Sequence, residues 1–399
     1  MPENIRSQPR GRPSVGRTIA SPGARADSTF RPESLRRHAN RTTVSPPYAR
    51  PMTLRHCLIV LSLLHAALSA GADPGEVLRT PEPAFLYEEA DGPLDYDRAV
   101  SLLLAEWEST YEPIRPGATG KVVLKIYTNS GLGLRTPPEL VLALARALEE
   151  RGFAREDIAL ADLKESRLRA AGYLPPVSRG GDRFEGLPVI ALDDPALFHP
   201  DWFYDSPLPP HQPAAAGAAA EAEAGLRAGD EDRKSFLPTP LLFDLDFWIN
   251  LPVAVEHPVL GLTGAVANAG LWTVSNHSRF FNRPVSAASS AVEIAAIPEL
   301  RRTALFSILS LETHQIIGGP RFNSHYTHSR PEVLLGNDPL LLDRYALAAI
   351  NAGRLERGFD PISPEPLFFR YGESLELGDA DLDPGRIRLV SPGSGESAE

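Results

Sequence analysis

The stretch Lys121-Val-Val-Leu-Lys125-Ile-Tyr127 begins the part of the sequence that decides the fold. It is apolar and rich in β-branched residues, which is typical of a buried strand. After a glycine-containing loop, Thr136-Pro-Pro-Glu139 combines an N-cap threonine, prolines for the first helical turn and a glutamate at the capping-box position. Ile158-Ala-Leu-Ala-Asp162 then reads as a second strand. Strand, helix and strand at this spacing form a βαβ unit, so the sequence predicts an α/β fold with a mostly parallel sheet flanked by helices.

Apolar periodicity extends this prediction in both directions. Leu140, Leu144 and Leu148 fall on one helical face, and Gly152 is a plausible C-cap. Further strands are expected over residues 187–192, 304–311, 332–336 and 366–371, and a helix end running into a buried strand over 241–252. Further helices are expected over residues 167–174, 262–271, 289 to 297 or 300, and 339–357. The Pro- and Ala-rich residues 206–234 are expected to form a disordered or weakly helical surface insertion.

The second methionine opens a segment with the layout of a secretory signal peptide. Residues 52–72 have a short basic start, an apolar run from Cys57 and a small-x-small end. An uncleaved membrane anchor is the alternative, but the run is shorter than the roughly 20 residues that a bilayer needs. Residues 1–51 are rich in Arg, Pro and Ser and are expected to be disordered. They are either a transit peptide or a segment that is not translated because translation begins at Met52. The sequence thus predicts a periplasmic or secreted protein with one α/β domain, residues 73–399, and no stable membrane span after cleavage.

Composition narrows the classes of partner. Cys57 is the single cysteine, so the mature chain has no thiolate for a zinc site or an iron–sulphur cluster. Residues 1–72 hold 11 Arg and 3 acidic residues, and their removal takes the net charge from −11 to −19. Such an acidic chain argues against nucleic acid and against anionic membranes.

A first polar group follows the strand that begins at Lys121. It consists of Lys125, Asn129, Arg135 and Thr136, at the carboxyl end where ligands bind in open α/β sheets. The N-terminus of the next helix would point to the same place. A lysine, an arginine and a helix N-terminus favour a small polar or anionic molecule as partner.

A second polar group consists of Asn250, His257, Asn268 and His277. Asn268 lies in an apolar helix, where a buried amide needs a hydrogen-bond partner. Two histidines with a carboxylate would suit a divalent metal, although no close His-x-x-x-His spacing is present. The cofactor is therefore left open, with a divalent metal as one alternative.

A third polar group lies toward the C-terminus. It includes Glu312, His314, the pair His325 and His328, and the segment 337–343. Within that segment, Asp338 precedes a proline, as an N-cap residue does, whereas Asp343 lies on an apolar helical background. Packed or solvated histidines and ordinary helix capping are the structural alternatives for this group.

The order of these motifs resembles a known family. The motifs are Val-Val-Leu-Lys125-x-x-x-Asn129, Thr136-Pro-Pro-Glu139, Ala-Asp162, Phe-Trp-Ile-Asn250-Leu-Pro, Glu-His257, Thr-Gly-Ala-Val-Ala-Asn268, His277, Gly-Gly-Pro320, Leu-Leu-Gly-Asn-Asp-Pro339 and Leu-Asp343. Together they resemble the bacterial and archaeal domain of unknown function 362 family, over about Lys121 to Val390. The resemblance implies an α/β fold with a shared cleft and implies no reaction. Where relatives carry lysines this chain has Val253, Val255 and Ala267, and it lacks their ferredoxin-like cysteine insertion.

Two functions fit these observations. The first is an exported enzyme that acts on a small polar or anionic substrate, with His257, His277 and Asp343 as catalytic residues. In that hypothesis Lys125, Asn129, Arg135, Thr136, Asn268 and Asp338 bind the substrate. The second is a non-catalytic ligand-binding or envelope-interaction protein that uses the same cleft. Both predict that Lys125, His257, Asn268 and Asp338 converge on one hollow at the strand ends.

Overall fold

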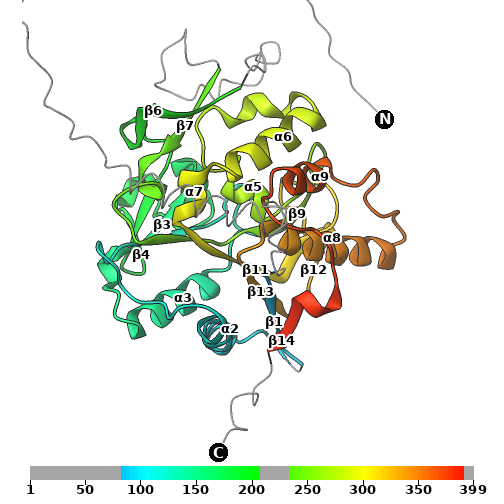
Figure 1. The fold of residues 1–399 in the computed structure, drawn as a ribbon, viewed down its shortest axis with the longest axis horizontal. Coiled ribbons are helices and arrows are strands. Elements are labelled where there is room, and N and C mark those ends of the chain that lie inside the picture. The colour runs from blue at the N-terminus through cyan, green and yellow to red at the C-terminus, as the bar shows by residue number, and fades with distance from the viewer. Residues whose placement is uncertain (1–81, 91, 207–232, 391–399) are drawn as a thin grey trace, which may run out of the picture. The chain divides into compact units, whose positions relative to one another are not determined.

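The computed structural model describes residues 82–90, 92–206 and 233–390 (Figure 1). The chain divides into two units, residues 1–77 and 78–399, and every described residue belongs to the second. The predicted signal peptide, residues 1–51 and most of the predicted insertion lie outside the described residues. Export therefore stays a prediction.

Within the described residues, twelve strands form one sheet and two form a separate hairpin. The strands are β1 (Ala84–Glu88), β2 (Val122–Lys125), β3 (Ile158–Asp162), β4 (Arg183–Phe184), β5 (Leu187–Ala191), β6 (Phe198–Asp205), β7 (Lys234–Pro238), β8 (Phe247–Asn250), β9 (Val253–His257), β10 (Gly261–Thr263), β11 (Ala304–Gln315), β12 (Thr327–His328), β13 (Glu332–Gly336) and β14 (Ile387–Val390). The α-helices are α2 (Tyr96–Thr110), α3 (Pro138–Glu150), α4 (Glu165–Ala170), α5 (Ala265–Ala269), α6 (Pro284–Ala295), α7 (Pro298–Thr303), α8 (Pro339–Glu356) and α9 (Leu367–Ser374).

The predicted βαβ unit is confirmed. Helix α3 connects β2 and β3, which pair in parallel with Val122 beside Ile158 and Lys125 beside Ala161. The main strand order is β14-β1-β13-β11-β8-β2-β3-β5-β4, and the run from β11 to β5 is parallel throughout. Strand β13 is antiparallel to both β11 and β1. The fold is thus a mixed α/β fold with a large, mostly parallel sheet, as predicted.

Helices cover both faces of the sheet (Figure 1). Helices α2 and α3 bury their apolar residues against one face, together with Leu124 and Ile249. Helices α5, α6, α8 and α9 pack on the other face, together with Val123 and Trp248. Since successive residues of a strand point to opposite faces, Lys125 belongs to the second face, below α5.

One row across the sheet is polar although it lies in the core. Lys125 of β2 is in register with Asn250 of β8, and Asn250 is in register with Ser307 of β11. All three side chains are buried. Because residues in register on parallel strands face the same side, the three polar groups lie next to one another. This row positions the candidate site described below.

Three local predictions are corrected. Residues 366–371 were expected to be a strand, but α9 is a helix that buries Phe368 and Phe369 against α6, α8 and the rest of that face. Thr136 does not cap α3: Pro137 occupies that position, and the Thr136 hydroxyl donates to the Leu251 carbonyl instead. The helix expected from residue 262 begins later, because residues 261–263 pair with β9 as β10. Strand β1 and helix α2 were not predicted.

None of the helices within the three described ranges is long and apolar enough to cross a membrane.

Candidate functional site

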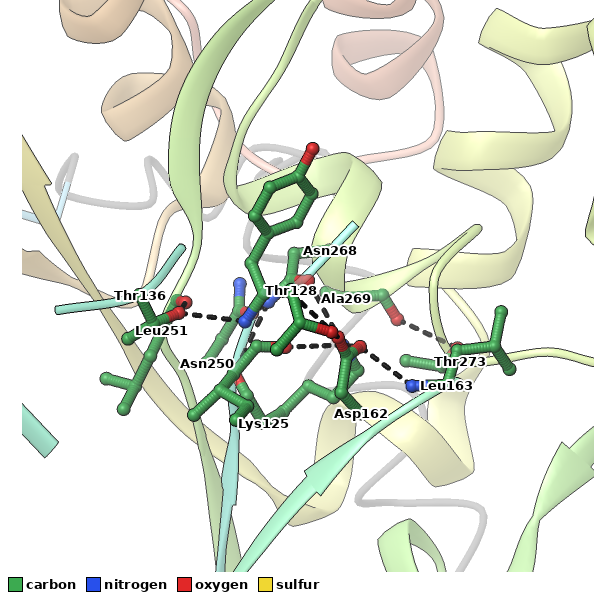
Figure 2. A network of polar contacts seen from close by, with 12 residues as sticks. Lys125, Thr128, Thr136, Asp162, Leu163, Asn250, Leu251, Asn268, Ala269 and Thr273 are labelled. Atoms are coloured by element: carbon green, nitrogen blue, oxygen red, sulfur yellow. Dashed lines mark hydrogen bonds and ion pairs between the residues drawn. The ribbon is translucent and has the colours of Figure 1, made fainter. Parts of the chain in front are cut away.

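A buried ion pair lies where β2 and β3 end (Figure 2). The Lys125 ammonium donates to Asp162 Oδ1 at 2.8 Å, and the side chains are 0% and 6% exposed. Burial lowers the pKa of Lys125, and the Asp162 carboxylate opposes that shift. The same ammonium donates to the Ile126 carbonyl at 2.9 Å and to Asn268 Oδ1 at 3.0 Å. All three protons of Lys125 therefore have acceptors, as a buried cation requires.

A chain of amide hydrogen bonds extends from this pair across the sheet, and Figure 2 shows its first members, Asn268 and Asn250. Asn268 of α5 donates to Asn250 Oδ1 at 2.8 Å, and Asn250 donates to Ser307 Oγ at 3.0 Å. The second proton of the Asn250 amide goes to the Ala265 carbonyl at 3.0 Å. The prediction that the Asn268 amide needs a partner is confirmed, since it contacts both Lys125 and Asn250.

The Asp162 carboxylate also holds the two loops that follow the strands. Its Oδ2 accepts from the Thr128 amide at 2.9 Å and from the Thr128 hydroxyl, and its Oδ1 accepts from the Leu163 amide at 2.7 Å. Both carboxylate oxygens are thus occupied by donors. One side chain fixes the start of the loop after β2 and of the loop after β3.

A small pocket opens at these loops, and we call it the β2–β3 pocket. Its volume is about 20 Å³, which accommodates one water-sized group. It is lined by Tyr127, Asn129, Asp162, Leu163, Lys164, Arg167, Trp272 and His277. Of the predicted site residues, Asn129 and His277 therefore line one pocket, and the Lys125 partner Asp162 joins them there.

His277 begins the 3₁₀-helix η5 (His277–Asn282) and is buried. Its ring packs edge-on against Trp272, with 5.1 Å between ring centroids. Burial lowers the pKa of His277 to about 3, and the nearby Lys164 charge adds to the shift. The imidazole is therefore neutral at neutral pH.

Two residues of the first predicted group, Arg135 and Thr136, do not line the β2–β3 pocket and make structural contacts elsewhere. Arg135 donates to the Ala171 carbonyl and lies 5.4 Å from the centre of the Tyr173 ring. Thr136 is fully buried, donates to Leu251 and accepts from the Tyr127 amide at 2.8 Å. These contacts tie the loop after β2 to the neighbouring strand and to the segment after α4.

His257 is held by the turn that it begins. Its Nδ1 accepts from the Val259 amide at 3.1 Å and from the Leu260 amide at 3.2 Å. Burial lowers the pKa of His257 to about 4. The ring lies 5.2 Å from that of Phe281, which in turn stacks on Trp272. His257 thus reaches the wall of the β2–β3 pocket through aromatic contacts.

Asp338 and Asp343 both cap helices. Asp338 accepts from the Leu340 and Leu341 amides at the start of α8 and forms an ion pair with Arg386 at 2.8 Å. Asp343 accepts from the first two amides of α5, those of Ala265 and Val266. Of the four residues expected to converge, only Lys125 and Asn268 are in contact; the hydrogen bonds of Asp338 and His257 go to other elements. The hollow predicted around all four is corrected to a buried network around two of them.

Asp343 gives a pH-dependent prediction. Burial raises the pKa of Asp343 to about 7, against the lowering effect of the two amide hydrogen bonds. A raised pKa means that the folded state binds this proton more tightly than the unfolded chain does. The protonated Asp343 side chain therefore adds to the free energy of unfolding below about pH 4, and this contribution is lost as the pH rises toward 7. An Asp343→Asn variant lacks this loss. We expect its free energy of unfolding, relative to the wild type, to improve by about 2–3 kcal/mol between pH 5 and pH 8 in urea titrations. A difference that is constant with pH would contradict this assignment.

The residues of the third predicted group do not form one cluster but take part in separate side-chain contacts. Tyr96 donates to Glu312 at 2.9 Å, while His328 contacts Glu356 at 2.8 Å. The His314 and His328 rings lie 5.5 Å apart. Within residues 82–90, 92–206 and 233–390, no group of three or more His, Cys, Asp or Glu side chains is arranged to hold a metal ion.

Comparison with known proteins adds little to these observations. No family model matches the chain, and no curated protein matches it. The resemblance to the domain of unknown function 362 family therefore stays a prediction. Among solved structures, a crystal structure of a Thermotoga maritima protein from a structural genomics consortium is similar, at 12% identity and a TM-score of 0.32. The match covers 66% of this chain and 59% of that one.

Sequence reasoning missed six of the eight pocket residues: Tyr127, Asp162, Leu163, Lys164, Arg167 and Trp272. A usable signal was present for Asp162, because it ends an apolar strand next to a strand that ends in Lys125. Opposite charges at the ends of two adjacent strands predict an ion pair. Lys164 and Arg167 follow that strand directly, and a search of every loop at a strand carboxyl end would have included them.

Proposed function

We propose that the β2–β3 pocket binds a small anionic molecule through a carboxylate or phosphate group. The observation that carries this proposal is that the cations Lys164 and Arg167 line the pocket together with the polar groups of Asn129 and Trp272. Guanidinium, ammonium and N–H donors are the groups that proteins use for carboxylates and phosphates.

Charge supports the same ligand class. The one acid among the lining residues, Asp162, is neutralised by its ion pair with Lys125. The other charged lining residues, Lys164 and Arg167, are both cations. Cationic side chains attract anions and repel cations.

Size limits how such a ligand would bind. A volume of about 20 Å³ admits an oxygen atom of the anionic group and little more. The rest of the ligand would lie at the mouth, beside Lys164 and Arg167. The proposal is thus anchoring of the charged end of a ligand and not its complete enclosure.

An enzyme that acts on the same anion is the second candidate. It is favoured by the presence of a carboxylate and an imidazole, Asp162 and His277, in one pocket. General base catalysis works best when the pKa of the base lies near the working pH. The pKa of about 3 for His277 is far from neutral, and both oxygens of Asp162 accept hydrogen bonds. The geometry therefore supports binding more strongly than acid–base chemistry.

The test is calorimetric titration with inorganic phosphate, sulfate, acetate and succinate. We expect at least one of them to bind and an Arg167→Gln variant to bind it at least about tenfold more weakly, because a charge-assisted hydrogen bond is lost. Arg179→Gln is the matched control: it removes the same charge from an exposed side chain outside the pocket. Absence of binding by all four probes, or equal weakening by both variants, would contradict the proposal. Chemical conversion of a bound probe, followed by NMR, would favour the enzyme instead.

A further inference from the structure

A second pocket lies at the other end of the amide chain. Its volume is about 230 Å³, and it opens where α7 leads into β11, beside the residues that follow β13. It is lined by Glu82, Trp248, Asn250, Ala269, Ala295, Arg301, Ala304, Leu305, Phe306, Ser307, Asn337, Pro339 and Leu377. We call it the Asn337 pocket. It shares no lining residue with the β2–β3 pocket.

Two donors face a ligand in the Asn337 pocket. Lys125 donates to Asn268, Asn268 to Asn250 and Asn250 to the Ser307 oxygen, while both amides also donate to backbone carbonyls. Since Ser307 accepts there, its hydroxyl proton is available for a second acceptor. Arg301 is exposed and has one hydrogen bond within the described chain, to the Glu376 carbonyl at 3.0 Å, which leaves most of its guanidinium available.

Two acceptors lie in the same pocket or beside it. The Asn337 side-chain oxygen is buried and has no hydrogen-bond partner within the described residues. A buried acceptor without a partner costs about 1–3 kcal/mol, so it marks a place where a donor is accommodated. Glu82 supplies a negative charge: after burial, it is the main cause of the raised pKa of Tyr111.

The remaining walls are apolar. Trp248, Phe306 and Leu377 are buried and line the pocket with Leu305, Pro339 and three alanines. Apolar walls with a few convergent polar groups are typical of small-molecule sites. The volume lies below the usual range for drug-sized ligands, which indicates a small occupant.

We infer that the Asn337 pocket binds a small zwitterion with an apolar side group, such as an aliphatic amino acid. The carboxylate of the ligand contacts Arg301 and the Ser307 hydroxyl. Its ammonium contacts Glu82 and donates to the unpartnered Asn337 oxygen. The side group lies against the apolar walls. A ligand with only one of the two charges lacks the contact with either Arg301 or Glu82, so the zwitterion is expected to bind more tightly.

The experiment is calorimetric titration of the protein with glycine, alanine, valine and leucine, and then with the N-acetyl and amide derivatives of the best binder. The N-acetyl derivative lacks the ammonium and the amide lacks the carboxylate. We expect the free amino acid to bind and each derivative to bind at least about tenfold more weakly. Binding should be unchanged in Arg167→Gln, so failure here is distinguishable from failure of the proposed anion site.

The matched variants are Arg301→Gln and Arg302→Gln. Both arginines are exposed on α7, and only Arg301 lines the pocket. We expect Arg301→Gln to weaken binding at least about tenfold and Arg302→Gln to leave it within about twofold. The inference is overturned if no amino acid binds, if the derivatives bind as tightly as the parent, or if both arginine variants behave alike.

Discussion

Replacing Lys125 by methionine is expected to lower the free energy of unfolding by about 3–5 kcal/mol. Methionine fills a similar volume but removes the buried ammonium. The Asp162 carboxylate then stays in the core without its counter-charge, and Asn268 Oδ1 loses its donor. Leaving one member of a buried ion pair uncompensated is among the most destabilising single changes. Urea titration at pH 7 measures the effect.

The matched control is Lys121→Met, which removes the same charge from an exposed residue just before the same strand. We expect it to change stability by less than about 0.5 kcal/mol. The double variant Lys125→Met, Asp162→Asn removes both charges together. Its loss should be smaller than the sum of the two single losses, because the uncompensated carboxylate is what costs free energy. Additive losses would mean that the two groups do not stabilise each other.

Replacing Asp338 by alanine is the second change with a large expected effect, again about 3–5 kcal/mol. The Asp338 carboxylate accepts from two amides that begin α8 and from the Asp379 amide at 2.9 Å. It also pairs with Arg386, whose side chain is 5% exposed. The variant therefore loses a helix cap and leaves a buried guanidinium without its nearest carboxylate.

Asp379→Ala separates this effect from simple loss of charge. Asp379 also faces Arg386, at 3.3 Å, but its side chain is 55% exposed. Exposed partners contribute little, so we expect a loss below about 1 kcal/mol. Thermal unfolding of the two variants beside the wild type measures the difference. Equal losses would show that the buried position of Asp338 does not matter.

The order of strands and helices could be predicted because it depends on local patterns. The apolar run that contains Lys125, the leucine periodicity of residues 140–148 and the proline at residue 339 each act within one element. They correctly located β2, α3 and α8. The prediction failed for residues 366–371, because the aromatic residues that suit a strand pack as one face of the helix α9.

The candidate site could be predicted only in part. Lys125 was identified because it lies near the carboxyl end of a strand, and Asn268 because a buried amide needs a partner; the two are in contact. Asp338 and Asp343 fit the same pattern, but their partners are backbone amides at helix starts. A carboxylate before or within a helix looks the same in sequence whether it caps a helix or binds a ligand.

The sequence by itself determined the βαβ unit, the α/β class and the need of the Asn268 amide for a partner, since periodicity and capping act over a few residues. Only the tertiary structure decided which polar groups meet. Lys125 meets Asp162 37 residues away and Asn268 143 residues away, and Asn250 meets Ser307 57 residues away. These contacts follow from the order of β11, β8, β2 and β3 in the sheet. That order is set by the packing of whole elements against one another, which no short stretch of chain encodes.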